Sequence, residues 1–225
     1  MDVTVEQSDV AANGGQLAFP VHPWWSYSTT VKRALDLVLA VVFLFCSLPL
    51  WGLIALAIKL DSPGPVFYTQ DRVGLRGSRF RFYKFRSMRD GAEHARAQLE
   101  HLNEVSGPVF KVRGDPRITQ VGSLLRRTSL DELPQLINVI RGQMSLVGPR
   151  PPLPEEVAMY RSSDMVRLAV KPGLTCWWQV RGRSTCDFET WMAYDREYVY
   201  GISLLVDLVI LLRTAWAVLS CRGAY

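Results

Sequence analysis

The sequence predicts a helix-rich α/β protein with short strands, anchored to one face of a membrane, which is a monotopic arrangement. One run, residues 37–58, has no charged side chain, as is typical of a membrane-embedded helix. Short segments bounded by glycine and proline turns predict strands. Two C-terminal segments predict interfacial amphipathic helices. The chain of 225 residues then divides into a head (1–30), a membrane helix (31–60) and a cytosolic domain (61–225).

The head is polar and acidic at its start, and no small-residue cleavage site follows an apolar core. We therefore expect no cleavable signal peptide and a disordered segment. Two tryptophans, Trp24 and Trp25, suit the membrane interface.

The apolar run could reach about 33 Å as a helix, which is enough to cross a bilayer core. Basic residues flank it on both sides, however, and the positive-inside rule places both flanks in the cytoplasm. Pro49 can break the helix, and Ser47 can bond a carbonyl that the proline leaves free. We expect a helix–break–helix that enters and leaves on the cytoplasmic face of the inner membrane. The alternative is a kinked helix that spans.

The following segments are expected in order after the membrane helix. Strands at 66–70 and 80–85 are joined by a loop at 74–77, a capping box at 90–93 opens a polar helix to about 105, and a short helix covers 121–127. A second capping box at 129–132 opens a helix over 130–141, and 148–152 is a rigid extended segment. A helix at 155–168, a strand at 174–180 and helices at 191–200 and 202–219 complete the chain.

The formal net charge is +5, from 26 basic and 21 acidic residues, which suits an anionic partner: a phosphate ligand, an anionic membrane or nucleic acid. Only five of the basic residues are lysines. Arginine grips phosphate with a planar fork, although a GC-rich genome explains the same bias equally well. The four cysteines lack metal-ligand spacing, so we expect them reduced and structural.

Asp131 and Glu132 fall in the first turn of the helix that the second capping box predicts. Free N–H groups and the helix dipole favour phosphate there and lower the pKa of a carboxyl group. With Arg126 just upstream, the two carboxylates could hold phosphate and Mg²⁺ together. The alternative, helix capping with surface ion pairs, is the one that spacing alone favours.

Two segments carry a family resemblance: Arg-Arg-Thr-Ser-Leu-Asp-Glu-Leu-Pro-Gln-Leu at 126–136 and Met-Ser-Leu-Val-Gly-Pro-Arg-Pro at 144–151. Further matches lie at 82–88, 107–111, 115–119, 171–175 and 178–183. Together they resemble the bacterial sugar transferases, the monotopic phosphoglycosyl transferases, over residues 32–219. The family's usual Ser-Pro pair stands here as Ser47-Leu48-Pro49.

The resemblance implies roles for individual residues. Asp131 is implied to be the nucleophile, and Glu132 is tied to Mg²⁺ and to activation. The implied substrate-binding residues are Lys84, Arg126 and Arg183 for the phosphates, Pro149, Arg150 and Pro151 for the nucleotide, and Gln179. Each has a plainer alternative: a solvated strand residue for Lys84, a loop cation for Arg183 and a spacer for 149–152.

The implied reaction transfers a sugar phosphate from a UDP-sugar to polyprenyl (undecaprenyl) phosphate, through a phosphosugar-aspartate, and releases UMP. Glucose or galactose is the expected sugar, for exopolysaccharide or lipopolysaccharide synthesis by a minimal catalytic form. Membrane lipids are implied partners and nucleic acid is not; a homodimer is left open. The rival reading is a non-catalytic scaffold that binds anionic lipid.

Overall fold

The computed structural model describes residues 27, 30–95, 97–104, 107–110, 112, 114–182 and 186–220. Nearly all of the predicted head therefore lies outside the described residues. The α-helices are α1 (Val31–Asp61), α2 (Gln120–Thr128), α3 (Gln135–Ile140), α4 (Pro154–Ala158), α5 (Trp177–Arg181), α6 (Phe188–Gly201) and α7 (Leu204–Leu219). The strands are β1 (Phe67–Val73), β2 (Arg79–Phe85), β3 (Ser145–Val147) and β4 (Gly173–Thr175). The α/β class with short strands is confirmed.

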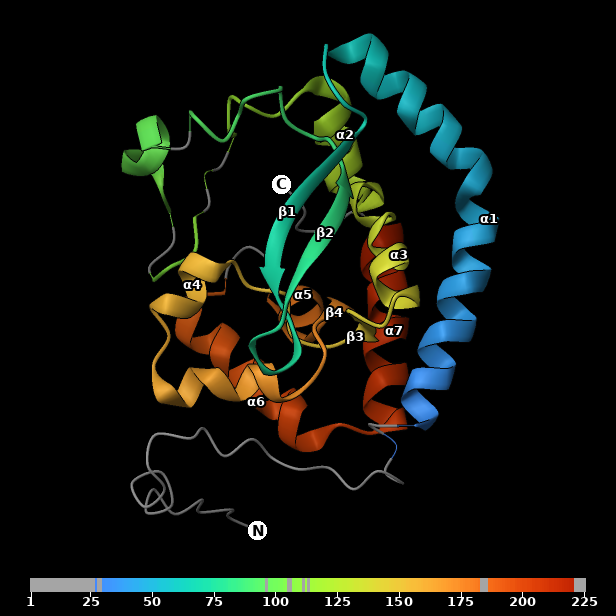
Figure 1. Cartoon of the computed structure of the whole chain (residues 1–225), viewed down its shortest axis with the longest axis vertical. Helices are drawn as coiled ribbons and strands as arrows, with labels where there is room; N and C mark the ends of the chain where they lie inside the picture. Colours follow the sequence, from blue (N-terminus) through green and yellow to red (C-terminus); the bar gives the residue numbers. More distant parts are fainter. Residues whose placement is uncertain are drawn as a thin grey trace.

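Helix α1 is the one described helix that is long and apolar enough to cross a membrane. It is assigned as a single helix through Pro49, and Figure 1 shows it curving along one edge of the molecule. The structure thus has one bent helix where we expected two helices and a break; the re-entrant path stays a prediction. Ser47 donates to the carbonyl of Leu44 (3.0 Å) and accepts from the indole N–H of Trp51 (3.0 Å). Its hydroxyl therefore bonds a different carbonyl from the one, at Phe45, that Pro49 leaves without a donor.

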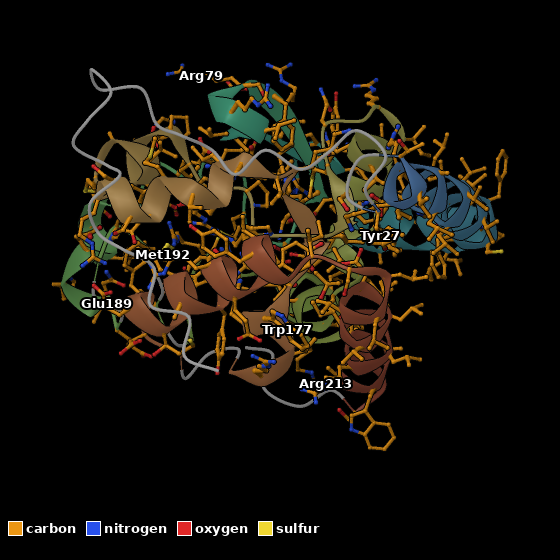
Figure 2. All side chains as sticks on the ribbon, turned by 90° about the horizontal axis from the view of Figure 1, so that it is seen from below. Tyr27, Arg79, Trp177, Glu189, Met192 and Arg213 are labelled. Carbon is orange, nitrogen blue, oxygen red and sulfur yellow. The ribbon has the colours of Figure 1, made fainter. Side chains whose placement is uncertain are left out.

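Buried charges attach the first turns of α1 to the rest of the protein. Lys32 Nζ lies 2.5 Å from Asp207 Oδ2 of α7, and the hydroxyl of Tyr27 donates to the same oxygen (2.7 Å; Figure 2). Asp36 accepts from the hydroxyl of Ser145 in β3 (2.7 Å). Because a buried charge is tolerated only when it is paired, these contacts fix how α1 lies against α7 and β3.

The hairpin β1–β2 lies at the centre of Figure 1 and pairs antiparallel, from Phe67 opposite Phe85 to Val73 opposite Arg79. It confirms both predicted strands and extends them. Phe80 and Phe82 join one core cluster with residues of α3, α6 and α7, and Phe85 joins a second with α1 and α2. The hairpin is thus held between the membrane helix and the C-terminal helices.

Two predicted helices were wrong. In the described part of 90–105 the chain forms turns and a 3₁₀ helix, Ala97–Leu102. Gly91 adopts a left-handed φ of 73° in the first turn of the expected helix, a conformation that a regular α-helix does not contain. The helix expected over 130–141 is divided: a 3₁₀ turn, Leu130–Glu132, precedes α3, and Pro134 is the N-cap of α3. A proline inside one continuous helix would clash with the carbonyl four residues earlier.

Ser129 does not form the expected capping box. It adopts a left-handed φ of 58° and closes α2, and its side chain makes no capping hydrogen bond with the described residues. Asp131 and Glu132 therefore follow a sharp turn between α2 and α3 and do not open a regular helix.

The C-terminal part differs from expectation in detail. Residues 155–168 form α4 and a 3₁₀ helix, Ser162–Ala169, and the expected strand at 174–180 shortens to β4 followed by α5. Strand β3 was missed; it pairs in parallel with β4. A Cβ atom added to Gly173 would lie 2.1 Å from the nitrogen of Gly148, so this pairing requires glycine. Helices α6 and α7 and the short helix α2 are confirmed.

Candidate active site

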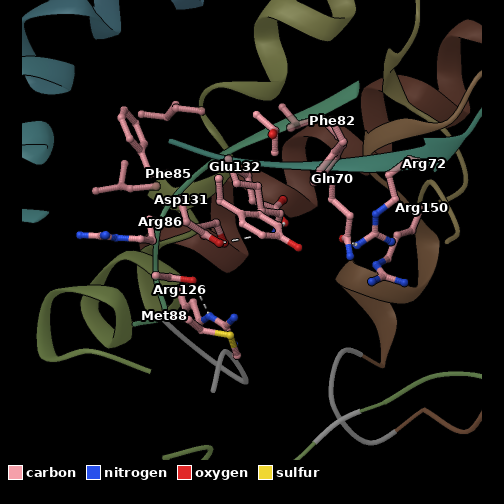
Figure 3. A pocket seen from close by; sticks show the side chains of 18 of the residues that line it. Gln70, Arg72, Phe82, Phe85, Arg86, Met88, Arg126, Asp131, Glu132 and Arg150 are labelled. Carbon is pink, nitrogen blue, oxygen red and sulfur yellow. Dashed lines mark hydrogen bonds and ion pairs between the residues drawn. The ribbon is translucent and has the colours of Figure 1, made fainter. Parts of the chain in front are cut away.

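The turn between α2 and α3 faces the second strand of the hairpin across a cavity of about 2050 Å³. Lys84 Nζ, from β2, lies 2.7 Å from Glu132 Oε1 and 3.5 Å from Asp131 Oδ2. Figure 3 shows the two carboxylates beside one another, with Arg126 to one side and Arg72 and Arg150 to the other. The structure thus brings together four of the predicted residues, Asp131, Glu132, Lys84 and Arg126, on one cavity wall.

Asn138 fixes α3 against β2 and so sets the distance between the carboxylates and Lys84. Its side chain is fully buried. Its oxygen accepts from the backbone N–H of Tyr83 (3.2 Å), and its amide donates to the carbonyl of Arg81 (2.7 Å). These bonds span the strand residues just before Lys84, which was not evident from the sequence because their partner lies 55 positions away.

Burial raises the pKa of Asp131, and the nearby charge of Lys84 only partly opposes this effect. The lowered pKa that we expected is therefore wrong. The expectation assumed an exposed helix N-terminus, whereas the carboxyl group lies in a short 3₁₀ turn with 5% of the residue exposed. Removal from water disfavours the charged form and makes the ionised oxygen a stronger nucleophile when it forms.

Arg126 supplies a cation on the other side of the carboxylates. Its Nε donates to the hydroxyl of Ser87 (2.9 Å), which is the one hydrogen bond that the guanidinium makes to the described residues. Burial lowers the pKa of Arg126, and the charge of Asp131 opposes that effect. Arg126 lines the cavity, and its terminal N–H groups make no hydrogen bond to the described residues.

The segment 149–152 is held by all four of its carbonyl groups. Pro149 accepts from the backbone N–H of Gly173 (2.9 Å), and Pro152 accepts from that of Val73 (2.9 Å). The carbonyl of Arg150 accepts from Arg167 (2.9 Å), and that of Pro151 accepts from Arg72 (2.9 Å). The segment is therefore clamped and is more than a spacer, because prolines fix φ and these bonds fix its position.

Arg72 and Arg150 bring two guanidinium groups to the same wall. Burial, followed by the charge of Arg150, lowers the pKa of Arg72 to about 9. Arg150 lies over the ring of Trp191 (5.5 Å to the centroid) and 3.6 Å from Glu156 Oε1. Since adjacent like charges repel, a bound phosphate would relieve this arrangement.

Arg72 and Gln70 were missed from the sequence. Gln70 Oε1 accepts from Arg72 (2.7 Å), and both line the cavity. Their spacing of two residues on a strand places them on one face, which is a signal that could have found them.

Gln179 lines the cavity from α5, and its side-chain oxygen lies 3.7 Å from the thiol of Cys176. Arg183 lies outside the described residues. Arg127, the neighbour of Arg126, is exposed and does not line the cavity. Among described residues, Cys46 is exposed, Cys176 buried and Cys186 half-buried, all as free thiols.

The described residues contain no group of three or more histidine, cysteine or acidic side chains that could hold a metal ion. Asp131 and Glu132 offer hard carboxylate oxygens next to each other. Magnesium is commonly bound by one or two carboxylates together with substrate phosphates and water. The pair therefore fits Mg²⁺ when a phosphate supplies further ligands.

Residues 27–221 match the family described as bacterial sugar transferase. The exopolysaccharide production protein ExoY of Sinorhizobium fredii is 40% identical over 198 residues, covering 86% of this chain and 88% of the relative. The undecaprenyl-phosphate galactose phosphotransferase of Salmonella typhimurium is 41% identical over 202 residues, covering 88% of this chain and 42% of the relative.

A third relative is the UDP-glucose:undecaprenyl-phosphate glucose-1-phosphate transferase of Escherichia coli. It is 41% identical over 203 residues, covering 87% of this chain and 41% of the relative. The chain thus spans most of the ExoY protein and less than half of either larger transferase.

Proposed function

The chain belongs to the bacterial sugar transferase family, and we propose that it transfers a sugar 1-phosphate from a UDP-sugar to polyprenyl phosphate. It is a phosphoglycosyl transferase, in keeping with the transferases that it resembles. The observation that carries the proposal is Lys84, which contacts both adjacent carboxylates in a cavity also lined by Arg126, Arg72 and Arg150.

We propose Asp131 as the nucleophile of a two-step reaction. Its carboxylate attacks the phosphorus that bears the sugar, an O–P bond forms, and the bond from that phosphorus to the bridging oxygen breaks to release UMP. Polyprenyl phosphate then attacks the same phosphorus and restores the carboxylate. Burial supports this role, because a desolvated carboxylate is a better nucleophile than a hydrated one.

The cations stabilise the phosphates, and the segment 149–152 binds the nucleotide. Lys84 and Arg126 lie beside the carboxylates, where charge develops on the transferring phosphoryl group. Asp131 and Glu132, together with the substrate phosphates, would hold Mg²⁺, whose charge would neutralise the diphosphate. Arg150 and its flanking prolines, positioned by Arg72, would take the nucleotide.

Two relatives bear the names of a galactose and a glucose transferase, which supports a neutral hexose as the sugar and exopolysaccharide synthesis as the setting. We propose that the protein associates with the cytoplasmic face of the inner membrane, and the apolar helix with its basic flanks supports this location. A non-catalytic scaffold is disfavoured, because lipid binding requires no buried carboxylate beside a lysine.

The proposed function is tested with purified protein in detergent, by measuring UMP release from UDP-glucose, UDP-galactose and UDP-N-acetylglucosamine with Mg²⁺ and polyprenyl phosphate. We expect release with one of the hexoses. Asp131→Asn should lower turnover by at least about three orders of magnitude and abolish a trappable phosphosugar adduct. Normal turnover by that variant would contradict the covalent mechanism, and no UMP from any sugar would contradict the function.

A further inference from the structure

A buried ion pair that does not line the cavity supports the segment 149–152. Arg167, in the 3₁₀ helix Ser162–Ala169, places its Nη2 atom 2.8 Å from Oδ2 of Asp195 in α6. The two side chains are 1% and 3% exposed, and neither residue lines the cavity. Any effect of this pair on the reaction must therefore pass through another residue.

The guanidinium of Arg167 binds the backbone of that segment as well as its own carboxylate. Nη2 donates to the carbonyl of Arg150 (2.9 Å), and Nη1 donates to the hydroxyl of Tyr160. A buried guanidinium is tolerated only when its charge is paired, which is what Asp195 provides. Because the guanidinium is planar and its donors have fixed directions, it holds the carbonyl of Arg150 in one place.

The ring of Trp191 connects the same ion pair to the side chain of Arg150. The guanidinium carbons of Arg167 and Arg150 lie 5.3 Å and 5.5 Å from the centroid of this ring. Trp191 lies in α6 four residues before Asp195, on the same face of the helix, and it is buried. The backbone and the side chain of Arg150 thus both depend on groups that contact Arg167.

The guanidinium of Arg150, which lines the cavity, donates no hydrogen bond to the described residues (Figure 3). Its Nη1 atom lies 3.6 Å from Oε1 of Glu156, which is too long for a hydrogen bond. The other oxygen of Glu156 accepts from the backbone N–H of Leu153 (2.8 Å). With no hydrogen bond to fix its direction, the guanidinium is oriented by the position of its backbone and by packing on Trp191.

We propose that Arg167 and Asp195 are positioning residues for the nucleotide. They hold the carbonyl of Arg150 and the ring of Trp191, and so direct the Arg150 guanidinium toward a phosphate of the UDP-sugar. The inference rests on the proposed function, in which Arg150 binds the nucleotide. A guanidinium that is oriented before the substrate arrives loses less conformational freedom on binding, which favours tight binding.

The first test compares the two substrates. Arg167→Met should raise the KM for the UDP-sugar at least about tenfold, because a displaced guanidinium loses its contact with the phosphate. The KM for polyprenyl phosphate should change less than about twofold, since the acceptor does not use Arg150. Arg196→Met is the matched control and should change neither value. Arg196 also pairs with a buried carboxylate, that of Asp164 (3.3 Å), but makes no hydrogen bond or ion pair with the segment 149–152.

A second variant separates positioning from stability. Arg167→Met alone leaves the carboxylate of Asp195 buried without its cation, so the protein should also unfold at a lower temperature. Combining it with Asp195→Asn removes both charges, and the unfolding temperature should recover toward that of the unmodified protein. The KM for the UDP-sugar should stay raised in this double variant. Its recovery together with stability would overturn the proposal and leave the ion pair a structural role.

A double-mutant cycle tests whether Arg167 acts through Arg150. Arg150→Met should itself raise the KM for the UDP-sugar, and adding Arg167→Met should change that KM less than about twofold further. Effects of the two substitutions that multiply would overturn the proposal, as would an unchanged KM in Arg167→Met or an equal rise in Arg196→Met. An unchanged KM in Arg150→Met would instead contradict the premise that Arg150 binds the nucleotide, and the absence of UMP release from the unmodified protein would contradict the proposed function.

Discussion

At the residue scale, the site depends on Lys84, which interacts with both carboxylates from a half-buried position. Its distance to Glu132 is that of a charge-assisted hydrogen bond, and its charge also acts on the more deeply buried Asp131. A lysine among alternating aromatics could have been a solvated strand residue, but in the fold its side chain points toward the two carboxylates.

The pH dependence of the first step should report this interaction. Burial raises the pKa of Asp131, and Lys84 opposes the rise by favouring the carboxylate. Because attack requires the ionised form, kcat/KM for the UDP-sugar should fall as pH drops through the raised pKa. Lys84→Gln removes the opposing charge, so the acid limb of its residual activity should move to higher pH. An acid limb at the same pH in both proteins would contradict the assignment.

Glu132 should be required for the dependence of the reaction on Mg²⁺. It offers a hard oxygen beside Asp131, so Glu132→Gln should lower kcat by orders of magnitude and weaken the dependence of rate on Mg²⁺ concentration. The measurement is a Mg²⁺ titration of UMP release in both proteins, with Glu189→Gln on the exposed start of α6, away from the cavity lining, as the matched control. If the unmodified enzyme were equally active in EDTA, the metal assignment would be wrong.

At the scale of elements, the site is a junction between the hairpin and the turn that precedes α3, and Asn138 holds the two together. The hydrogen bonds are made to backbone groups of β2 rather than to side chains. Their effect is therefore on the position of the strand, and through it on Lys84.

Replacing Asn138 should affect geometry and stability together. Asn138→Leu leaves the Tyr83 N–H and the Arg81 carbonyl unsatisfied, each at a cost of about 1–3 kcal/mol, so thermal unfolding should occur at a lower temperature. UMP release should fall as well. Asn138→Asp keeps the acceptor for Tyr83 and should retain more of both. Full activity in Asn138→Leu would show that the position of β2 is not set by this side chain.

The sequence predicted the elements whose signals are local. The hairpin strands, α2, α6 and α7 follow from alternation, caps and apolar spacing. Asp131 and Glu132 were located by their motif, but the left-handed Ser129 and the division at Pro134 changed their setting from an exposed helix start to a buried turn. Arg72 was missed, because its contact with the carbonyl of Pro151 joins residues 79 positions apart, and its spacing of two from Gln70 is the only local signal.

At the scale of the whole molecule, the question is how the single long helix meets the membrane. Both flanks of α1 are basic, and buried pairing of Lys32 with Asp207 ties its first turn to α7. At the other end, Arg86 donates to the carbonyls of Ser62 (2.7 Å) and Pro63 (2.5 Å). Both ends of the helix are thus attached to the same folded body.

This double attachment leads to a prediction about topology. A helix that spans would place its two ends on opposite sides of the bilayer, whereas Lys32 and Arg86 hold both ends against one domain. Cysteines introduced at positions 20 and 75 in a protein without its native cysteines should therefore both resist a membrane-impermeant maleimide in intact cells. Both should react once the cells are opened, because the positive-inside rule keeps basic flanks in the cytoplasm.

Pro49 should be needed for that outcome. The proline removes one helical hydrogen bond, and Pro49→Ala restores it and favours a straight helix. The alanine variant should therefore make position 20 reactive from outside in a fraction of the molecules, while position 75 stays protected. Labelling of position 20 from outside in the unmodified protein would establish a spanning helix and end the re-entrant interpretation.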